Sequence, residues 1–376
     1  MTAASLFKQG SGRPPYRADH VGSLLRPKAL RDAFKQHMKR EIDDASFTKV
    51  MDACIIEVLK MQKDIGLKVG NDGEFRRGSY WSRFVERVAG FEIKQAIFKF
   101  RDDSGHEMDF TAPYANGKIA RRQPLALDEY QFIRAHTKLE GKITLPAPST
   151  MHFYRATDFA DKSVYQDQDK FFEDLSRAFQ EEIAELAKAG CTYVQLDEVA
   201  IAMLCDPSIR AQVTSFGADP DKLVDLYIDA INQAVASAPG HVAIGVHVCR
   251  GNFKGHYMAS GGYDSVAEKF FAQTRVNHFL LEYDTARSGD FAPLRFVPKS
   301  RGVVLGLVSS KTPVLETLDD LKRRTNEATK YIDLDRLAIS PQCGFASTVA
   351  GNPVTEADQR AKLSQVVEAS RMIWGA

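Results

Sequence analysis

Short apolar runs alternate along the chain with longer stretches in which apolar positions recur every three or four residues. The runs predict eight buried strands, at residues 18–23, 67–71, 142–147, 192–198, 242–249, 277–283, 302–308 and 337–341. The longer stretches predict helices, one opening at Pro27 and the others at residues 46–65, 127–136, 169–188, 220–236, 264–274, 316–331 and 355–374. The clearest helix covers residues 169–188, and Gly190 follows it as a C-terminal cap.

The order of these elements predicts the fold class. None of the runs alternates cleanly between apolar and polar residues, which is typical of strands that are buried on both faces. Alternating strands and helices favour a parallel sheet, and eight such units predict an α/β fold of the closed (β/α)8, or TIM, barrel type. A doubly wound open sheet is the alternative.

One region breaks this rhythm. Residues 91–124 contain alternating segments around Asn116-Gly117, a dipeptide typical of a tight hairpin turn. We interpret this region as a β-hairpin insertion into the barrel and not as a separate domain. The prediction is a single catalytic domain over residues 17–376, preceded by a polar arm at residues 1–16 that is loose or contacts a partner.

Composition and charge exclude several classes of partner. Lys plus Arg (50) nearly cancel Asp plus Glu (49), so the net charge of +1 gives no electrostatic reason to expect nucleic acid or an anionic membrane. No apolar run reaches the length of a membrane span, and the N-terminal residues lack the apolar core of a signal peptide. Five scattered cysteines are too few for a disulfide framework, which favours a reducing cytoplasm and leaves thiols available to a metal.

Polar residues follow several of the predicted strands, where barrel enzymes carry their active sites. They are Ser23, Glu74, Asp197, Glu198, His247, Cys249, Glu282 and Cys343. His247 and Cys249 are two residues apart on one strand, so their side chains lie on the same face and offer half of a zinc site. Glu282 and Cys343 could complete it from two later strand ends. A buried cysteine is more often a small packing residue, so a metal site and a packed core both remain open.

The order and spacing of these motifs resemble cobalamin-independent methionine synthase, specifically its catalytic barrel, from about residue 17 to the end. The matching pieces are Val21-Gly22-Ser23, Asp64-Ile65-Gly66-Leu67, Asp72-Gly73-Glu74-Phe75, the Asn116-Gly117 hairpin, Gln195-Leu196-Asp197-Glu198, His247-x-Cys249, Glu282 and Gln342-Cys343-Gly344. The resemblance implies a 5-methyltetrahydropteroyltriglutamate–homocysteine S-methyltransferase, which forms methionine. It also implies Zn²⁺ held by His247, Cys249, Glu282 and Cys343.

The resemblance also implies where the substrates bind. The homocysteine carboxylate falls at Ser23, in the motif that begins with Val21, and its ammonium falls at Glu74 and Asp197. Tyr154 stands where the family has a tryptophan against the pterin of a methyl-folate donor. Apart from the resemblance, Arg26, Arg76 and Arg77 are candidates for binding a folate glutamate or a substrate carboxylate, with a solvated surface position as the alternative for each.

The ligand charges suit activation of a thiol. A free thiol is mostly protonated at neutral pH, and zinc deprotonates a thiol that coordinates it. Three anionic ligands leave the zinc centre a formal charge of −1, which keeps the bound thiolate nucleophilic. Lys311 stands where the family has a histidine that is a candidate acid for the leaving amine. Glu198 is a candidate for orienting His247 or holding a substrate amine.

Several alternatives remain open from the sequence. The family's full-length enzymes carry a second, N-terminal barrel, which this chain has no room for, so the methyl donor is in doubt. A zinc-thiolate alkyltransferase that uses a methylcorrinoid, an epoxide, a methyl ether or another thiol is the main alternative. A non-catalytic zinc site and a metal-free barrel like uroporphyrinogen decarboxylase are the others. A homo-oligomer is compatible with every reading.

Overall fold

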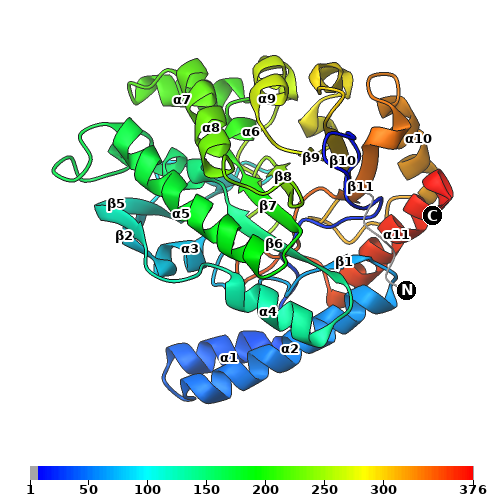
Figure 1. Ribbon diagram of the computed structural model, residues 1–376, viewed down its shortest axis with the longest axis horizontal. Coiled ribbons are helices and arrows are strands. Elements are labelled where there is room, and N and C mark those ends of the chain that lie inside the picture. The colour runs from blue at the N-terminus through cyan, green and yellow to red at the C-terminus, as the bar shows by residue number, and fades with distance from the viewer. Residues whose placement is uncertain (1–6, 376) are drawn as a thin grey trace.

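A parallel sheet of seven strands, curled round on itself, forms the centre of the molecule in a computed structural model that describes residues 7–375 (Figure 1). The strand order is β1-β6-β7-β8-β9-β10-β11, and all neighbouring pairs are parallel. The strands are β1 (Val69–Gly70), β6 (Glu140–Pro146), β7 (Tyr193–Glu198), β8 (Ala243–Val248), β9 (His278–Glu282), β10 (Gly302–Val308) and β11 (Leu337–Pro341). Every residue of these strands except Glu140 is buried, as the continuous apolar runs predict.

Helices surround the outside of the curled sheet (Figure 1). The helices are α1 (Lys28–Met38), α2 (Asp44–Asp64), α3 (Ser82–Arg87), α4 (Leu127–His136), α5 (Gln168–Lys188), α6 (Ala200–Met203), α7 (Pro207–Ser215), α8 (Pro220–Ala234), α9 (Ala267–Gln273), α10 (Leu318–Ala328) and α11 (Glu356–Trp374). Polar caps fix the starts of six of them, where side chains accept hydrogen bonds from first-turn amides: Asp43, Asp167, Asp206, Asp219, Thr317 and Thr355. None of the described helices is long and apolar enough to cross a membrane.

The prediction of a strand at residues 18–23 is wrong, because these residues do not form a continuous row of backbone hydrogen bonds with a neighbouring strand of the described chain. In the described part of the chain, residues 18–23 make one parallel bridge, between Ala18 and Ile339 of β11. After this bridge, side chains form hydrogen bonds with backbone groups that would otherwise pair with a strand. The His20 amide donates to Asp19 Oδ1 (2.7 Å), and the Val21 carbonyl accepts from Gln195 Nε2 (2.6 Å). Because those groups are already bonded, they pair with no neighbouring strand.

The second predicted strand, residues 67–71, shrinks to the two residues of β1 for a similar reason. The side chain of Gln62 on α2 accepts from the Asn71 amide (3.1 Å) and donates to the Asn71 carbonyl (2.8 Å). The sheet is therefore a curled seven-stranded sheet, consistent with a TIM-like barrel, and not a ladder of eight strands within the described residues.

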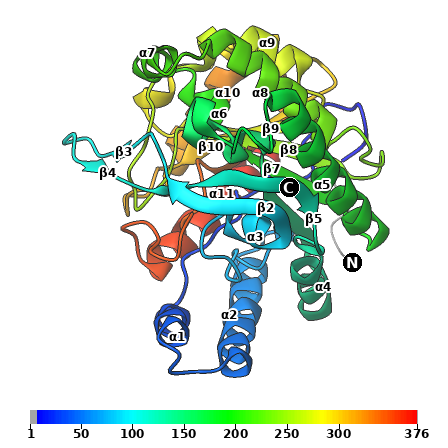
Figure 2. The ribbon, with the colours of Figure 1, turned by 90° about the vertical axis from the view of Figure 1, so that its left-hand side faces the viewer.

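An antiparallel excursion lies outside the main sheet and pairs β2 (Val88–Gln95) with β5 (Thr111–Arg121). The turn predicted at Asn116-Gly117 is wrong, since both residues lie inside β5. Gly90, at φ +88°, opposes this dipeptide, and a Cβ on it would lie 2.4 Å from the Gly117 carbonyl oxygen, so the two glycines allow close backbone contact. The projecting pair in Figure 2 is β3 (Phe100–Arg101) and β4 (Glu107–Met108).

The described part of the N-terminal segment, residues 7–16, lies against the amino-terminal ends of the strands. Tyr16 packs with Val69, Tyr193 and Ala243 at the starts of β1, β7 and β8, and Phe7 packs against this cluster. Residues 1–6 of the predicted arm lie outside the described residues.

Candidate metal and substrate site

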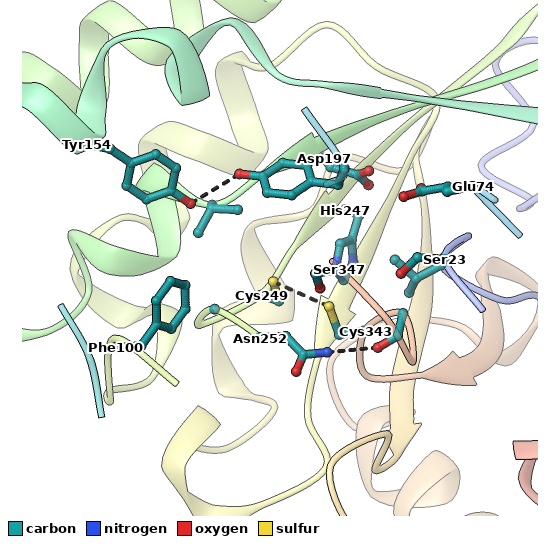
Figure 3. A pocket seen from close by; sticks show the side chains of 15 residues that line it. Ser23, Glu74, Phe100, Tyr154, Asp197, His247, Cys249, Asn252, Cys343 and Ser347 are labelled. Carbon is teal, nitrogen blue, oxygen red and sulfur yellow. Dashed lines mark hydrogen bonds between the residues drawn. The ribbon is translucent and has the colours of Figure 1, made fainter. Parts of the chain in front are cut away.

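A pocket with an empty volume of about 450 Å³ opens at the carboxyl ends of the strands (Figure 3). Residues from distant parts of the sequence line it, because parallel strands end at the same edge of the sheet. Of the residues predicted from the sequence, the lining includes Val21, Ser23, Glu74, Tyr154, Asp197, His247, Cys249 and Cys343.

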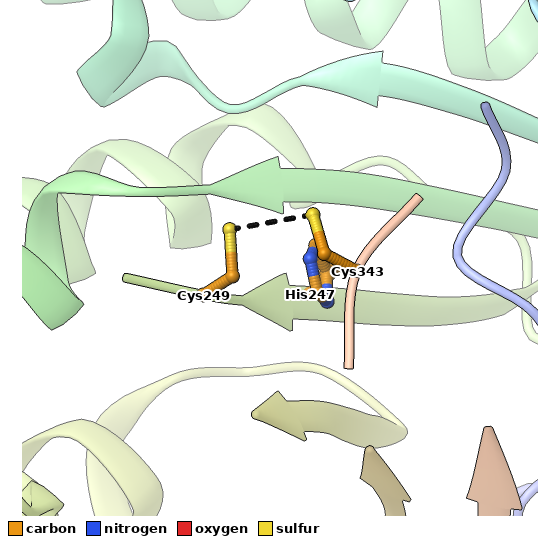
Figure 4. A group of neighbouring side chains, drawn as sticks. All are labelled: His247, Cys249 and Cys343. Carbon is orange, nitrogen blue, oxygen red and sulfur yellow. Dashed lines mark hydrogen bonds between the residues drawn. The ribbon is translucent and has the colours of Figure 1, made fainter. Parts of the chain in front are cut away.

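One wall of the pocket holds an imidazole and two thiols (Figure 4). One ligand atom from each of His247, Cys249 and Cys343 lies within 4.8 Å of the others, and the two sulfur atoms are 3.7 Å apart. His247 Nδ1 lies 3.3 Å from the Leu280 carbonyl oxygen, while Nε2 has no hydrogen-bond partner among the described residues. A ring that donates through Nδ1 keeps the Nε2 lone pair free, which is the usual state of a metal-binding histidine.

The chemistry of this group fits Zn²⁺. All five cysteines, each among the described residues, are free, so Cys249 and Cys343 are not consumed by a disulfide. The hydrogen bond between them holds the pKa of Cys343 well below its usual value and raises that of Cys249 well above it. The lowered pKa favours a thiolate at Cys343, and two sulfurs with one nitrogen are typical zinc ligands.

Glu282, the fourth predicted ligand, lies beside this group but is not part of the set that converges within residues 7–375. Its Oε2 accepts from the Arg250 amide (2.7 Å), and its Oε1 lies 3.2 Å from Arg287 Nη2. Burial alone would raise the pKa of this carboxyl, but the charges of Lys311, Arg250 and Arg287 lower it overall. The carboxylate is therefore ionised and held by cations.

Two buried carboxylates, Glu74 and Asp197, face each other in the same pocket (Figure 3), and Asp197 pairs in register with His247 on the neighbouring strand. Glu74 Oε1 accepts from Thr144 Oγ1 (2.7 Å), whereas its Oε2 has no hydrogen-bond partner within the described chain. Burial raises the pKa of Glu74, and burial together with the charge of Glu74 raises that of Asp197 to about 7. A cation between the two oxygens would relieve both effects.

The backbone at Glu74 is strained, and the surrounding hydrogen bonds hold it in that conformation. Glu74 has φ +59°, a left-handed conformation that costs a residue other than glycine about 1–3 kcal/mol. Its amide donates to Asp72 Oδ1 (2.9 Å) and its carbonyl accepts from Arg26 Nη2 (2.8 Å). Such strain is retained where the surroundings enforce it, which is common at binding sites.

Ser23 lies on the same side as the carboxylates, and close packing holds it there. A Cβ on Gly344 would lie 2.0 Å from Ser23 Oγ, so only glycine after Cys343 leaves room for the hydroxyl. Figure 3 shows Ser23 between Glu74 and Cys343.

Two predicted arginines lie away from the pocket lining. The buried Arg26 guanidinium donates to four backbone carbonyls: Glu74, Arg77, Ala346 and Thr348. Arg76 forms an ion pair with Asp52 (2.6 Å) and lies over the Phe132 ring. Arg26 thus braces the loop that carries Glu74, and Arg76 connects that loop to α2.

The two predicted catalytic residues also lie behind the lining. Glu198 is fully buried, accepts from Ser149 Oγ (2.5 Å) and from the Ile201 amide (2.9 Å), and burial raises its pKa to about 7. Lys311 Nζ donates to the Gly251 carbonyl (3.1 Å), and its charge acts on Cys249 and Glu282. Glu198 therefore supports the end of β7, while Lys311 lies next to the thiols.

The structure adds residues that the sequence reasoning missed. Tyr80, Phe100 and Asn252 line the pocket, with Tyr80 Oη 3.1 Å from Tyr154 Oη and Asn252 Nδ2 donating to the Gly344 carbonyl (2.7 Å). The aromatic run that follows Arg77 and the phenylalanines at residues 98–110 were the available signal. Their convergence depends on how the excursion folds back, which periodicity does not show.

A second cavity, with an empty volume of about 1010 Å³, continues the pocket outwards and shares Tyr80, Phe100 and Tyr154 with it. We call it the outer chamber. Its other aromatic lining residues are Trp81, Phe110 and Phe253. No lysine or arginine occurs among the described residues that line it.

A curled parallel sheet whose strand ends carry a thiol–imidazole group and, in the same pocket, two facing carboxylates defines an α/β enzyme with a candidate metal centre. The family model of the cobalamin-independent synthase catalytic domain matches residues 18–371. The chain therefore belongs to the cobalamin-independent methionine synthase family, and it is a methyltransferase of the 5-methyltetrahydropteroyltriglutamate–homocysteine type.

Individual proteins are similar over nearly the whole chain. The protein YxjH of Bacillus subtilis is 38% identical over 366 residues, covering 96% of each chain. A methionine synthase of Pyrococcus abyssi is 26% identical over 328 residues, covering 86% of this chain and 85% of its own. The crystal structure of a putative vitamin-B12-independent methionine synthase from Listeria monocytogenes superposes with a TM-score of 0.76 at 30% identity, covering 97% of this chain and 99% of its own.

Proposed function

We propose that the enzyme is a zinc-dependent methyltransferase that transfers a methyl group from a folate-type donor to the thiol of homocysteine, giving methionine. One observation carries the proposal: the group of His247, Cys249 and Cys343 lines the same pocket as Glu74 and Asp197. A substrate with a thiol at one end and an ammonium at the other matches these two groups of side chains.

The metal wall would hold Zn²⁺ through His247 Nε2 and the sulfurs of Cys249 and Cys343. When bound, zinc supplies a Lewis acid that keeps the substrate thiol deprotonated at neutral pH. We retain Glu282 as the proposed fourth ligand. It would have to turn away from Arg287, and its charge already acts on Cys249.

The two carboxylates would fix the amino acid. Glu74 Oε2 and Asp197 would accept hydrogen bonds from the ammonium of the substrate. Ser23 would donate to the substrate carboxylate, which would lie beside the backbone of Val21. When two carboxylates bind one ammonium, they orient the thiol of the substrate towards the methyl group. This orientation lowers the entropic part of the activation barrier for methyl transfer.

The donor would enter through the outer chamber, with its planar head against Tyr154. The leaving nitrogen of a folate-type donor must be protonated, and Lys311 is the proposed proton source, with Glu198 supporting the adjacent strand end. The uncharged lining of the chamber also favours a second candidate, an alkyltransferase that uses a methylcorrinoid, an epoxide or a methyl ether, or another thiol as acceptor.

The proposal also includes a fold assignment. The chain at residues 17–21 takes the place of the eighth barrel strand. Its bridge to β11 supports this, as does the Leu24 amide, which donates to the Gly73 carbonyl (3.0 Å).

The remaining assignments concern the domain, the compartment and the partners. The proposed domain spans residues 17–376, with the arm before it. We assign the enzyme to the cytoplasm, and its five free cysteines support this assignment. The proposed interaction partners are small molecules. A homo-oligomer remains an open assignment.

The test is turnover of homocysteine by zinc-loaded enzyme with each donor in turn: methyltetrahydrofolate, a methylcorrinoid, an epoxide and a methyl ether. Methionine from the folate donor supports the first assignment. Alkylation only from another donor replaces it with the second. No product with any donor contradicts both.

A further inference from the structure

A fully buried chain of hydrogen bonds runs inside the curled sheet and ends on Asp197. Lys142 on β6 and Gln195 on β7 form its middle, and both have side chains with no exposed surface. Neither residue touches the pocket, and neither has a role in the mechanism above.

Lys142 has all three of its ammonium donors used. Its Nζ donates to Asp19 Oδ1 (2.8 Å), to the His20 carbonyl and to Gln195 Oε1 (3.1 Å). Asp19 is itself held, because its Oδ2 accepts from Tyr193 Oη (2.6 Å). The lysine head is therefore fixed in place by a neutralising carboxylate.

The lysine determines which way the Gln195 amide points. An ammonium only donates, so the amide oxygen must face Lys142 and the amide nitrogen must face the other way. There Nε2 donates one hydrogen to the Val21 carbonyl (2.6 Å) and the other to Asp197 Oδ1 (2.7 Å). Both donors of the amide are used, and the reversed orientation would place an oxygen against two acceptors.

The bond to Gln195 leaves the two oxygens of Asp197 unequal. Oδ1 accepts the hydrogen bond from Gln195, so Oδ2 is the oxygen available to a ligand in the pocket. Figure 3 shows Glu74 facing the Asp197 carboxylate. The same amide also donates to the backbone carbonyl of Val21, two residues before Ser23.

We propose that Gln195, oriented by Lys142, is a positioning residue that sets Asp197 for the ammonium of the amino acid and so determines selectivity for substrates that carry an α-amino group. The inference rests on the proposed function, because it requires Asp197 to bind that ammonium. It adds that specificity depends on buried residues that touch no substrate.

The test compares two thioethers that differ only in the amino group, methionine and 4-(methylthio)butanoate. Neither has a free thiol, so the comparison does not require the metal to capture sulfur. Dissociation constants are measured by calorimetry for the wild-type enzyme, Gln195→Met and Gln195→Glu. Gln195→Met removes both donors, and Gln195→Glu keeps an acceptor for Lys142 but places an oxygen against Asp197.

Both variants are expected to bind methionine at least about 10-fold more weakly, the loss expected for one hydrogen bond to a charged group. Binding of 4-(methylthio)butanoate should change less than about 2-fold, because that ligand does not use Asp197. In an Asp197→Asn background, Gln195→Met should have no further effect on the ratio of the two constants. A general packing defect would weaken both ligands alike.

Tyr193→Phe is the matched control. It removes a buried hydroxyl from the same network without touching Gln195, and the ratio should stay within about 2-fold of wild type. Circular dichroism melting and metal content check that each variant is folded and that its metal centre is unaltered.

The outcomes separate the two proposals. Wild-type preference for methionine that collapses in both Gln195 variants supports the inference. Preference that persists in them overturns the inference and leaves the ammonium site intact. Wild-type enzyme that binds the two ligands equally, or neither of them, overturns the ammonium site and the inference together.

Discussion

Two buried carboxylates, Asp19 at the base of the curled sheet and Glu74 at its mouth, have opposite surroundings. Asp19 accepts hydrogen bonds from Lys142, Tyr193 and the His20 amide, and the charge of Lys142 helps to lower its pKa against the effect of burial. Glu74 has one oxygen without a partner in the described chain, and burial raises its pKa.

The nearest cation to Glu74 is shared with a second carboxylate. Arg77 Nη1 lies 3.6 Å from Glu74 Oε1, but the guanidinium donates through two nitrogens to Glu129, at 2.6 and 3.2 Å. The base of the sheet thus has a lysine bonded directly to its carboxylate, whereas the cation at the mouth is shared, and the pKa of Glu74 stays raised. A buried carboxylate that is only partly compensated favours a ligand that supplies more positive charge, so the contrast distinguishes a structural carboxylate from a binding one.

The largest effect should come from the metal wall. Cys343→Ala removes one of three converging ligands and should reduce bound zinc from about one per chain to a small fraction, with loss of methyl transfer. Metal analysis after dialysis measures this. Cys191→Ala, which changes a buried cysteine just before β7, is the control, and full zinc occupancy in Cys343→Ala would contradict the metal assignment.

At the base, Lys142→Met should leave Asp19 as an uncompensated buried charge and destabilise the protein by about 3–5 kcal/mol. Denaturant unfolding monitored by circular dichroism measures the loss. The double variant Asp19→Asn, Lys142→Met should recover much of it. A single variant as stable as wild type would show that Asp19 does not need its counter-ion.

At the mouth, Glu74→Gln should have the reverse effect. Homocysteine affinity should fall by about 10-fold to 100-fold, since a charge-assisted contact to the ammonium is lost. The free energy of unfolding should change little, because the buried charge that disappears has one unpartnered oxygen and only a shared cation. Calorimetry and denaturant unfolding on one preparation test both halves, and unchanged affinity with lowered stability would reverse the contrast.

The smallest effect concerns pH. Asp197 has its pKa raised to about 7, so it gains negative charge as the pH rises through that value. Methionine keeps its ammonium over this range, so its affinity should increase between about pH 6 and pH 8, and Asp197→Asn should remove the increase. Equal pH profiles for the two proteins would assign the titration elsewhere.

Much of the fold could be predicted from the sequence, because buried parallel strands and capped amphipathic helices leave local signals. The predicted helix at residues 127–136 coincides with α4, and the strand at residues 302–308 coincides with β10. The strand at residues 18–23 failed because side chains from Asp19 and Gln195 bind its backbone. The Asn116-Gly117 turn failed because those residues serve a close approach to Gly90 inside a strand pair.

The site shows the same division. The spacing of His247 and Cys249 on one strand was a local property, and Cys343 converges with them as predicted from its strand end. The engagement of Glu282 by Arg287, the use of Arg26 as a backbone brace and the outer chamber depend on contacts between distant segments. Such contacts follow from the packed structure and not from periodicity or spacing.

The most direct test of the central claim is zinc-edge X-ray absorption of metal-replete enzyme with and without homocysteine. The account predicts that homocysteine adds one sulfur scatterer at about 2.3 Å to the zinc coordination shell. It also predicts that methionine, whose sulfur is already methylated, does not. A spectrum unchanged by saturating homocysteine would contradict the claim that this centre activates the thiol.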